Sequence, residues 1–351
     1  MYEFKCCIDS EYWDLHTIKY QMIDILDDKL DVKVFPESSV SKELSQEFGY
    51  SEWMVCRFLQ FIPNLRACLI SMERGLPKYI RINTLKITKN DLIQRLIDKG
   101  VGYEDTILNE VLLVKRSRYP IGATTEYLLG YYYIQDLTSC IAVDELDVLP
   151  YQLNLDMASA PGGKTTYISQ KMKNSGCIVA LEPNPRRIKS LKFNLSRCGI
   201  INACIYGLDA HYAQRLGLKF DRVLLDAPCS CEGIIAKDPT IKTSLEPQKI
   251  EECMQRQIEL LLRAVELVKR GGLIVYSTCT FAPEENELVI NKLLSLRSNI
   301  SLEPQKYGEP GLVKYGDLTM DESLVNTRRF YPHLHNTSGF YIAKIRIKKS
   351  E

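Results

Sequence analysis

Residues 156–165 of this chain read Asp156-Met157-Ala158-Ser159-Ala160-Pro161-Gly162-Gly163-Lys164-Thr165. An apolar, strand-like segment at 153–157 leads into this run, and a helical pattern at 165–172 follows it. The two glycines therefore lie in a turn that joins a strand to a helix. Such a turn is where a doubly wound α/β sheet binds a nucleotide-like ligand, so the segment predicts a Rossmann-like domain.

Strands and helices alternate downstream of this turn, which predicts a mostly parallel sheet with helices on both faces. The strand at 220–226 is apolar almost throughout, as expected for a strand buried on both sides. Residues 305–335 mix Gly, Pro and Tyr and are expected to form a long loop. The expected strands lie at 153–157, 177–181, 203–206, 220–226, 273–276 and 340–347, and the expected helices at 165–172, 185–198, 250–269 and 284–296.

The region before the glycine turn has a different character, and three domains are expected. They are a helical domain at 1–76, a small α+β unit at 77–126 and the Rossmann-like domain at 127–351. Ser51 is expected to be a helix N-cap, and Gly100 ends a predicted helix. The helices expected in this region lie at 14–30, 38–48, 51–62 and 88–99, and the strands at 79–83 and 111–115.

The composition is that of a soluble globular protein, with 45% hydrophobic and 25% charged residues. No apolar run approaches the roughly 20 residues of a membrane span, and the acidic N-terminus does not resemble a secretory signal. We therefore expect a cytoplasmic protein without a membrane partner, and we also expect it to be monomeric.

The net charge of +1 neither predicts nor excludes a polyanionic partner, because binding depends on local patches. Any one basic group is best explained as part of a solvent-exposed surface, but several groups near one predicted site favour a polyanionic partner. The groups are Lys78, Arg81 and Lys86; Lys115, Arg116 and Arg118; Arg186, Arg187, Lys189 and Lys192; and Arg328 and Arg329.

The twelve cysteines are scattered through segments with helical or strand periodicity, so most are expected to be small core residues. A disulfide framework is not expected in a large chain without a secretion signal. No two Cys-x-x-Cys units occur, and Cys229-x-Cys231 is too short a unit to hold a tetrahedral metal. His333-x-His335 is more typical of a surface or RNA contact. We therefore expect no bound metal.

The glycine turn matches neither common phosphate-binding pattern. A Walker A loop requires glycine where this chain has Ala158, and the G-x-G-x-x-G pattern also fails. Glu182 follows the glycines by about 20 residues, the spacing of an acid that binds ribose hydroxyls. Asp209 and Asp226 end the next two predicted strands at the same sheet edge. These acids could merely cap helices, but three at successive strand ends favour a site for S-adenosylmethionine.

Cys229 and Cys279 each follow a predicted buried strand, in Asp-Ala-Pro-Cys at 226–229 and Tyr-Ser-Thr-Cys-Thr at 276–280. A thiolate is a soft nucleophile, and beside a nucleoside cofactor it suits covalent attack on an electron-poor ring. Addition at carbon 6 of cytosine would make carbon 5 able to attack a sulfonium methyl group. Packing is the competing explanation for both cysteines, although Pro228 favours an exposed turn.

The other groups expected in this chemistry assist the adduct. Asp226 lies in the same short segment as Cys229, so an acid at this position could hydrogen-bond a ring nitrogen and stabilise the adduct. A second thiol would assist product release, and the target base must leave its stack to reach the pocket.

These segments resemble the Nop/Sun family of RNA cytosine-5 methyltransferases. The resemblance covers roughly residues 48–347, with the motifs in the family's order. The segments that carry it are 51–55, 81–86, 135–139, 156–165, 226–230, 277–280, 283–287 and 339–344. The family's fold would make the unit at 77–126 RRM-like and the domain at 127–351 a methyltransferase domain.

The resemblance also implies a role for each site residue. Cys279 would be the nucleophile at carbon 6, and Cys229 would aid release of the methylated RNA. Lys164 would face the target base, with Asp226 as the other catalytic group. The residues implied to hold S-adenosylmethionine are Ala158, Ser159, Ala160, Pro161, Gly162, Gly163, Lys164, Glu182, Asp209 and Asp226.

Three positions depart from the family pattern. Ala158-Ser159 stands where Cys-Ala is common, Cys231 stands where the family often has glycine, and Ser338 replaces a common acid. The resemblance predicts methylation of tRNA or rRNA. The alternative is a non-catalytic RNA-binding or ribosome-assembly factor, which would not need both cysteines and all three acids.

Overall fold

The structure is a computed structural model that describes residues 32–349. The helix expected at 14–30 lies outside the described residues. From Val32 onward the chain forms one compact unit. The three domain boundaries expected from the sequence stay predictions.

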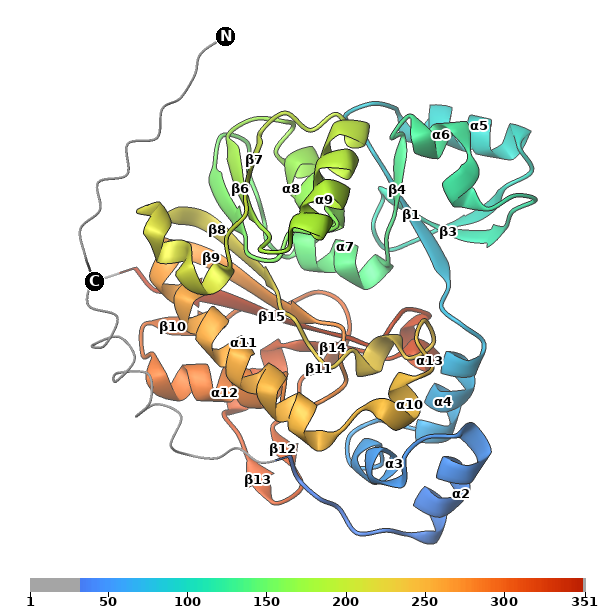
Figure 1. The fold of residues 1–351 in the computed structure, drawn as a ribbon, viewed down its shortest axis with the longest axis vertical. Coiled ribbons are helices and arrows are strands. Elements are labelled where there is room, and N and C mark those ends of the chain that lie inside the picture. Colours follow the sequence, from blue (N-terminus) through green and yellow to red (C-terminus); the bar gives the residue numbers. More distant parts are fainter. Residues whose placement is uncertain (1–31, 350–351) are drawn as a thin grey trace. The chain divides into compact units, whose positions relative to one another are not determined.

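A nine-stranded sheet organises the described chain (Figure 1), with strand order β11-β14-β15-β9-β8-β5-β6-β7 and β10 paired with β15. Strands β9, β8, β5, β6 and β7 are parallel, as predicted, whereas the strands on the β15 side are antiparallel. The bounds are β5 (Leu153–Asp156), β6 (Cys177–Leu181), β7 (Ala203–Tyr206), β8 (Phe220–Asp226), β9 (Val268–Thr278), β10 (Ile300–Leu302), β11 (Glu309–Pro310), β14 (Arg328–Phe330) and β15 (Phe340–Ile347).

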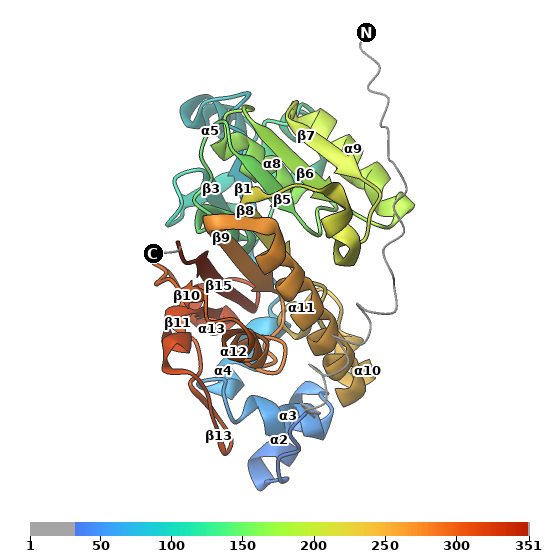
Figure 2. The ribbon, with the colours of Figure 1, turned by 90° about the vertical axis from the view of Figure 1, so that its left-hand side faces the viewer.

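Helices cover this sheet because its strands are apolar on both faces. Leu224 of β8 and Val275 of β9 share one core with α7 and α8. Since side chains alternate along a strand, Val223 and Leu225 face the other way, and α11 packs against β8 and β9 there (Figure 2). The helices are α7 (Leu137–Asp144), α8 (Gly163–Lys171), α9 (Pro185–Cys198), α11 (Pro247–Leu267) and α12 (Glu287–Leu296).

A second, antiparallel sheet has the order β2-β3-β1-β4. Its apolar face packs on α5, whose Leu92 and Leu96 are fully buried with Ile80 and Leu112. Thr88 caps α5 by accepting a hydrogen bond from the N–H of Asp91. The elements are β1 (Lys78–Ile82), β2 (Gly102–Asp105), β3 (Val111–Arg116), β4 (Tyr132–Ile134) and α5 (Lys89–Asp98), followed by η1 (Ile121–Ala123) and α6 (Thr125–Leu128).

Three helices precede this sheet, and two expectations about them need correction. The helix expected at 51–62 ends at Phe58, and residues after it form turns. Ser51 stands at the N-cap position, but its side chain makes no capping hydrogen bond. Ser38 instead forms a capping box with Ser41 at the start of the preceding helix. The helices are α2 (Ser39–Phe48), α3 (Glu52–Phe58) and α4 (Leu65–Glu73).

The long loop expected at 305–335 is also wrong in part. Strand β14 pairs with β15 through Arg329 opposite Tyr341, so this segment extends the main sheet. The signal is weak in sequence because the pieces are short and gain their stability from distant partners. The remaining elements are β12 (Lys314–Tyr315), β13 (Leu318–Thr319), η2 (Ala210–Leu216), η3 (Glu232–Ile234), η4 (Glu322–Asn326), α10 (Ile241–Ser244) and α13 (Pro332–His335). Within the described residues, no helix has the length and apolarity needed to cross a bilayer.

Candidate active site

The carboxyl ends of β8 and β9 bring two cysteines into contact. The strands are parallel neighbours with Asp226 opposite Ser277, so the residues after each strand emerge at one sheet edge. Cys279 follows β9 directly, and Cys229 follows β8 after a short turn. Their Sγ atoms lie 3.3 Å apart, and both residues are half-buried. The two thiols that the sequence singled out therefore share one site.

A third thiol lies in the same place. The Sγ atom of Cys231 is 3.7 Å from that of Cys279, and the Cys231 thiol donates to the carbonyl oxygen of Cys229 at 3.4 Å. Cys231 has a φ of +65°, in the left-handed region that favours glycine. We call Cys229, Cys231 and Cys279 the three-thiol cluster.

The loops that carry this cluster approach each other closely at Gly233. Its N–H donates to the carbonyl oxygen of Cys279 at 2.9 Å, and its own carbonyl accepts from the N–H of Gly339 at 2.9 Å. A Cβ atom at Gly233 would lie 2.2 Å from the carbonyl oxygen of Gly339. A larger residue would force these backbones apart, so Gly233 fixes the spacing of the two cysteine loops.

The three thiols also control one another's ionisation. Hydrogen bonds with Cys229 and Cys279 lower the pKa of Cys231. The pKa of Cys229 is raised by its hydrogen bonds with Cys231 and Cys279, and by burial. At Cys279 the hydrogen bond with Cys229 lowers the pKa, but the bond with Cys231 and burial raise it well above its usual value. One negative charge on the cluster therefore opposes a second ionisation.

An ion pair between Lys164 and Asp226 stands next to the cluster. The Lys164 Nζ atom donates to Asp226 Oδ2 at 2.6 Å, and Ser277 Oγ donates to Oδ1 at 2.7 Å. Burial alone would lower the pKa of the Lys164 ammonium, but Asp226 more than offsets burial and raises it. Cys279 adds to this rise, so Lys164 stays charged near that thiol.

The glycine turn is organised by Asp156 at the end of β5. Its carboxylate accepts from Thr165 Oγ1 at 2.7 Å and from the Ala158 N–H at 3.3 Å, and its carbonyl accepts from Ser159 Oγ at 2.9 Å. Burial raises the pKa of Asp156 to about 6, against the effect of the Thr165 hydrogen bond. Gly162 starts α8 with a φ of +107°, which residues with a Cβ rarely adopt.

Two further acids lie beyond this turn. Glu182 follows β6 and is 1% exposed; its Oε1 accepts from the Asn184 N–H at 2.9 Å, and its Oε2 pairs with Arg187 at 3.1 Å. Asp209 caps η2 by accepting from the His211 N–H at 2.8 Å, and it forms an ion pair with Arg256. Asp209 therefore caps a helix, which the sequence left open as the alternative to a cofactor role for the three acids. The same arginine, Arg187, also donates to the Ala160 carbonyl of the glycine turn at 2.7 Å.

Comparison with known proteins decides the family. The family described as 16S rRNA methyltransferase RsmB/F matches residues 144–346. A crystal structure of a methyltransferase homolog protein from Pyrococcus horikoshii is 37% identical with a TM-score of 0.82, over 88% of this chain and 99% of that one. This chain belongs to the Nop/Sun family of RNA cytosine-5 methyltransferases. The cofactor of this family is S-adenosylmethionine.

Two curated relatives are enzymes that act on ribosomal RNA. A 28S rRNA (cytosine-C(5))-methyltransferase of Mus musculus is 40% identical over 319 residues, 88% of this chain and 40% of the mouse protein. Ribosomal RNA small subunit methyltransferase F of Escherichia coli K12 is 35% identical over 304 residues, 82% of this chain and 60% of that protein. This Nop/Sun chain thus spans about half the length of these relatives.

The residues at the sheet edge fit the family's cofactor. The buried carboxylate of Glu182 offers acceptor oxygens for ribose hydroxyls, as the acid after the second strand does in doubly wound sheets. The turn at Gly162 and Gly163 lets backbone approach a ligand closely. Bound there, S-adenosylmethionine would supply the methyl group for transfer.

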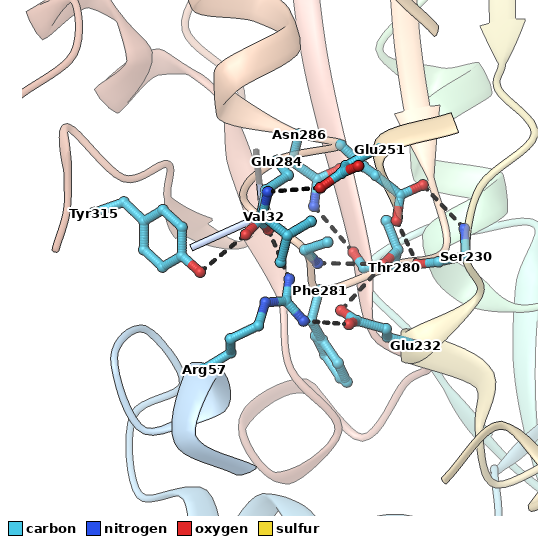
Figure 3. A network of polar contacts seen from close by, with 12 residues as sticks. Val32, Arg57, Ser230, Glu232, Glu251, Thr280, Phe281, Glu284, Asn286 and Tyr315 are labelled. Atoms are coloured by element: carbon cyan, nitrogen blue, oxygen red, sulfur yellow. Dashed lines mark hydrogen bonds and ion pairs between the residues drawn. The ribbon is translucent and has the colours of Figure 1, made fainter. Parts of the chain in front are cut away.

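A buried arginine ties the two cysteine loops to the N-terminal helices of this Nop/Sun chain (Figure 3). Arg57 of α3 is 1% exposed and donates to Glu232 Oε1 at 2.8 Å and Glu284 Oε2 at 2.6 Å. Glu232 follows Cys231, and Glu284 lies five residues after Cys279. Burial would lower the pKa of Arg57, but Glu284 and Glu232 raise it well above its usual value. Arg57 therefore holds both loops in one arrangement.

Glu285 links the same loops through a neutral hydrogen-bond chain. Its Oε2 accepts from the Ser230 N–H and from Gln257 Nε2, both at 2.9 Å, and its Oε1 contacts Ser230 Oγ. Ser230 Oγ is in turn 2.9 Å from Thr280 Oγ1. Burial raises the pKa of Glu285 to about 8, even though Ser230 lowers it. A protonated Glu285 can donate from Oε1 into this chain.

Glu285→Gln is expected to flatten the pH dependence of stability. Folded wild-type protein keeps the Glu285 proton between pH 4.5 and about 8, whereas the unfolded chain releases it. Stability is therefore lost as pH rises through that window, by roughly 1 kcal/mol per pH unit. Glutamine cannot titrate and can make the same contacts. Urea unfolding at several pH values measures the slope, with the exposed Glu322→Gln as control; an unchanged slope would contradict the assignment.

Sequence patterns missed the buried cations that support this site. Arg81 of β1 is 1% exposed and donates to the Gly163 carbonyl and to Gln135, each at 2.6 Å, so it supports the glycine turn. Arg329 is also buried and pairs with Glu287. Both had been assigned to basic surface groups, and that part of the prediction is wrong. The only sequence signal was the position of Arg81 inside an apolar strand, where a charge needs a partner.

Proposed function

We propose that this chain methylates carbon 5 of cytosine in RNA, through a transient bond between Cys279 Sγ and carbon 6. The observation that carries this proposal is the contact of Cys279 with Cys229 at the sheet edge that also holds the glycine turn and the Lys164–Asp226 pair. The two curated relatives act on ribosomal RNA, which favours rRNA over tRNA as substrate.

Cys279 acts as the nucleophile in this scheme. Its sulfur bonds to carbon 6, which gives carbon 5 the electron density to take a methyl group from S-adenosylmethionine. Asp226 is held from both sides by Lys164 and Ser277, so its carboxylate has little freedom to rotate away from the base. The proton of the Cys279 thiol passes to the ring nitrogen as the sulfur adds, and the fixed carboxylate accepts a hydrogen bond from the resulting N–H, which stabilises the adduct without reorganisation.

Cys229 assists the reverse step. After methyl transfer the proton on carbon 5 passes to solvent, and its bonding electrons form the carbon 5–carbon 6 double bond as the bond between sulfur and carbon 6 breaks. At 3.3 Å from Cys279 Sγ, the Cys229 thiol is near enough to return a proton to the departing sulfur. Cys231 has no role assigned in this scheme.

RNA contacts are proposed for the rim of this site and for the two units before it. Lys115, Arg116 and Arg118 at the end of β3 are exposed, as are Arg186 and the lysines of α9. Exposed cations of this kind contact phosphates and position RNA without reading its sequence. The helical unit at 1–76 and the RRM-like unit at 77–126 are proposed as the parts that select the target, in a monomeric cytoplasmic enzyme.

Cys229→Ala tests the proposed roles. We expect the variant to form the adduct but fail to release it, so a protein–RNA species appears on a denaturing gel after incubation with S-adenosylmethionine and total RNA. Adding Cys279→Ser to this variant should remove the band, and the exposed Cys204→Ala should never produce it. A band from Cys231→Ala instead would assign release to Cys231, while no band from any variant and no methylation would favour the non-catalytic RNA-binding alternative.

A further inference from the structure

The three-thiol cluster has the geometry of a soft-metal site. Its sulfur atoms are separated by 3.3 Å between Cys229 and Cys279 and by 3.7 Å between Cys279 and Cys231, and all three lie within 4.8 Å of one another. A zinc–thiolate bond of about 2.3 Å at tetrahedral angles gives neighbouring sulfurs a spacing of about 3.8 Å. The three sulfurs thus form one face of a tetrahedron with little movement.

The loops hold these sulfurs in place before any ligand arrives. The Gly233 N–H ties the loop after β8 to the carbonyl oxygen of Cys279. Glu285 accepts from the N–H of Ser230, the residue between two of the cysteines. A preformed set of ligands binds a metal more tightly, because less conformational entropy is lost on binding.

The chemistry of the ligands selects the type of cation. Thiolates prefer soft ions such as Zn²⁺ and Cd²⁺, whereas Mg²⁺ and Ca²⁺ prefer oxygen. Three thiolates carry one negative charge more than a divalent cation can neutralise, and the Lys164 ammonium, which pairs with Asp226, also attracts the charge on Cys279. Taken alone, the Cys-x-Cys unit at 229–231 is too short to hold a tetrahedral metal, and this argued against a metal site. The structure adds a third ligand, Cys279, from the end of another strand.

We propose that Cys229, Cys231 and Cys279 bind one soft divalent cation of the Zn²⁺ or Cd²⁺ type, with water or a small anion in the fourth position. Each thiol that is still protonated loses its S–H proton to solvent as its metal–sulfur bond forms, so affinity rises with pH. Cys231 is the deciding ligand, since it stands where the family pattern often has glycine. Its side chain turns a pair of thiols into a three-coordinate site.

Occupation of this site has a consequence that rests on the proposed function. A cation bound to the Cys279 sulfur removes the lone pair that must attack carbon 6, so methyl transfer stops until the cation is removed. Inhibition by Zn²⁺ should then be reversed by a chelator. Mg²⁺ at the same concentration should have no such effect.

Cadmium titration of the full-length, metal-free protein tests the site directly. Each cadmium–thiolate bond adds ultraviolet charge-transfer absorption, so we expect one Cd²⁺ to bind with the signal of three thiolates. Removal of a residue that only hydrogen-bonds to a metal ligand already costs about 10–100-fold in metal affinity. Cys231→Gly removes a ligand itself, so binding should weaken by at least about 100-fold. Glycine suits the φ of +65° at this position, and Cys231→Ser serves as a second variant if the glycine variant does not fold.

The other cysteine pairs provide the controls. Cys177 and Cys204 have sulfurs 3.9 Å apart, and Cys6 and Cys7 are adjacent in sequence. Variants Cys204→Ser and Cys6→Ser with Cys7→Ser should keep the tight site. Equal affinity in wild type and both Cys231 variants, or loss of tight binding in the control variants, would overturn the proposal. Tight binding without any methylation activity would instead count only against the proposed function.

Discussion

Cys279→Ser is expected to abolish methyl transfer, with a fall of at least about 10³-fold in the single-turnover rate. A serine hydroxyl ionises far less readily than a thiol and is a weaker nucleophile toward a pyrimidine ring. Cys229 is proposed to act in release and Cys231 has no role in the scheme, so neither thiol is expected to replace it. Transfer of labelled methyl from S-adenosylmethionine to ribosomal RNA, followed by detection of 5-methylcytosine, measures the loss.

The control for this experiment separates chemistry from folding. Cys204→Ser changes an exposed thiol in the same way and should retain the wild-type rate. Serine differs from cysteine by one atom and Cys279 is half-buried, so the variant should bind RNA and S-adenosylmethionine as the wild type does. If 5-methylcytosine still forms at a comparable rate, the nucleophile is another residue.

Arg57→Leu is expected to destabilise the fold by about 3–5 kcal/mol. Arg57 is 1% exposed and its two partners are fully buried, so its removal leaves Glu232 and Glu284 as uncompensated charges. The Tyr315 hydroxyl, which donates to Glu284 at 3.1 Å, cannot neutralise them. Urea unfolding at pH 7 measures the loss. Any folded fraction should transfer methyl groups slowly, because these glutamates fix the loops of Cys231 and Cys279.

Two comparisons test the reason for this loss. Arg66→Leu removes an arginine that pairs with Glu43 and Glu47 at the surface, where water screens the charges, and it should shift the unfolding midpoint far less. Adding Glu232→Gln and Glu284→Gln to Arg57→Leu should restore part of the stability, because no buried charge then lacks a partner. An Arg57→Leu protein as stable as the wild type would show that the pairing is not what holds the loops.

Elements with strong local signals were predicted with accurate bounds. Strand β8 is largely apolar, and α9 has Asn184 as its N-cap, Pro185 as its first residue and Gly199, with a φ of +74°, as its C-cap. Their residues matched the expected 220–226 and 185–198, because periodicity and capping act within a few residues. Short strands such as β14, whose Arg329 finds its partner 42 residues away, had no comparable local signal.

Sequence alone determined the alternation of strands and helices, and with it the family and the gathering of Glu182, Asp209, Asp226 and Cys279 at one sheet edge. Parallel strands force this result, since their carboxyl ends share an edge. Only the tertiary structure decided which groups touch: the third thiol at Cys231, and Arg57 with partners 175 and 227 residues away. The reason is physical, because hydrogen-bond ladders and caps depend on near neighbours, whereas contacts between loops depend on how the whole core packs.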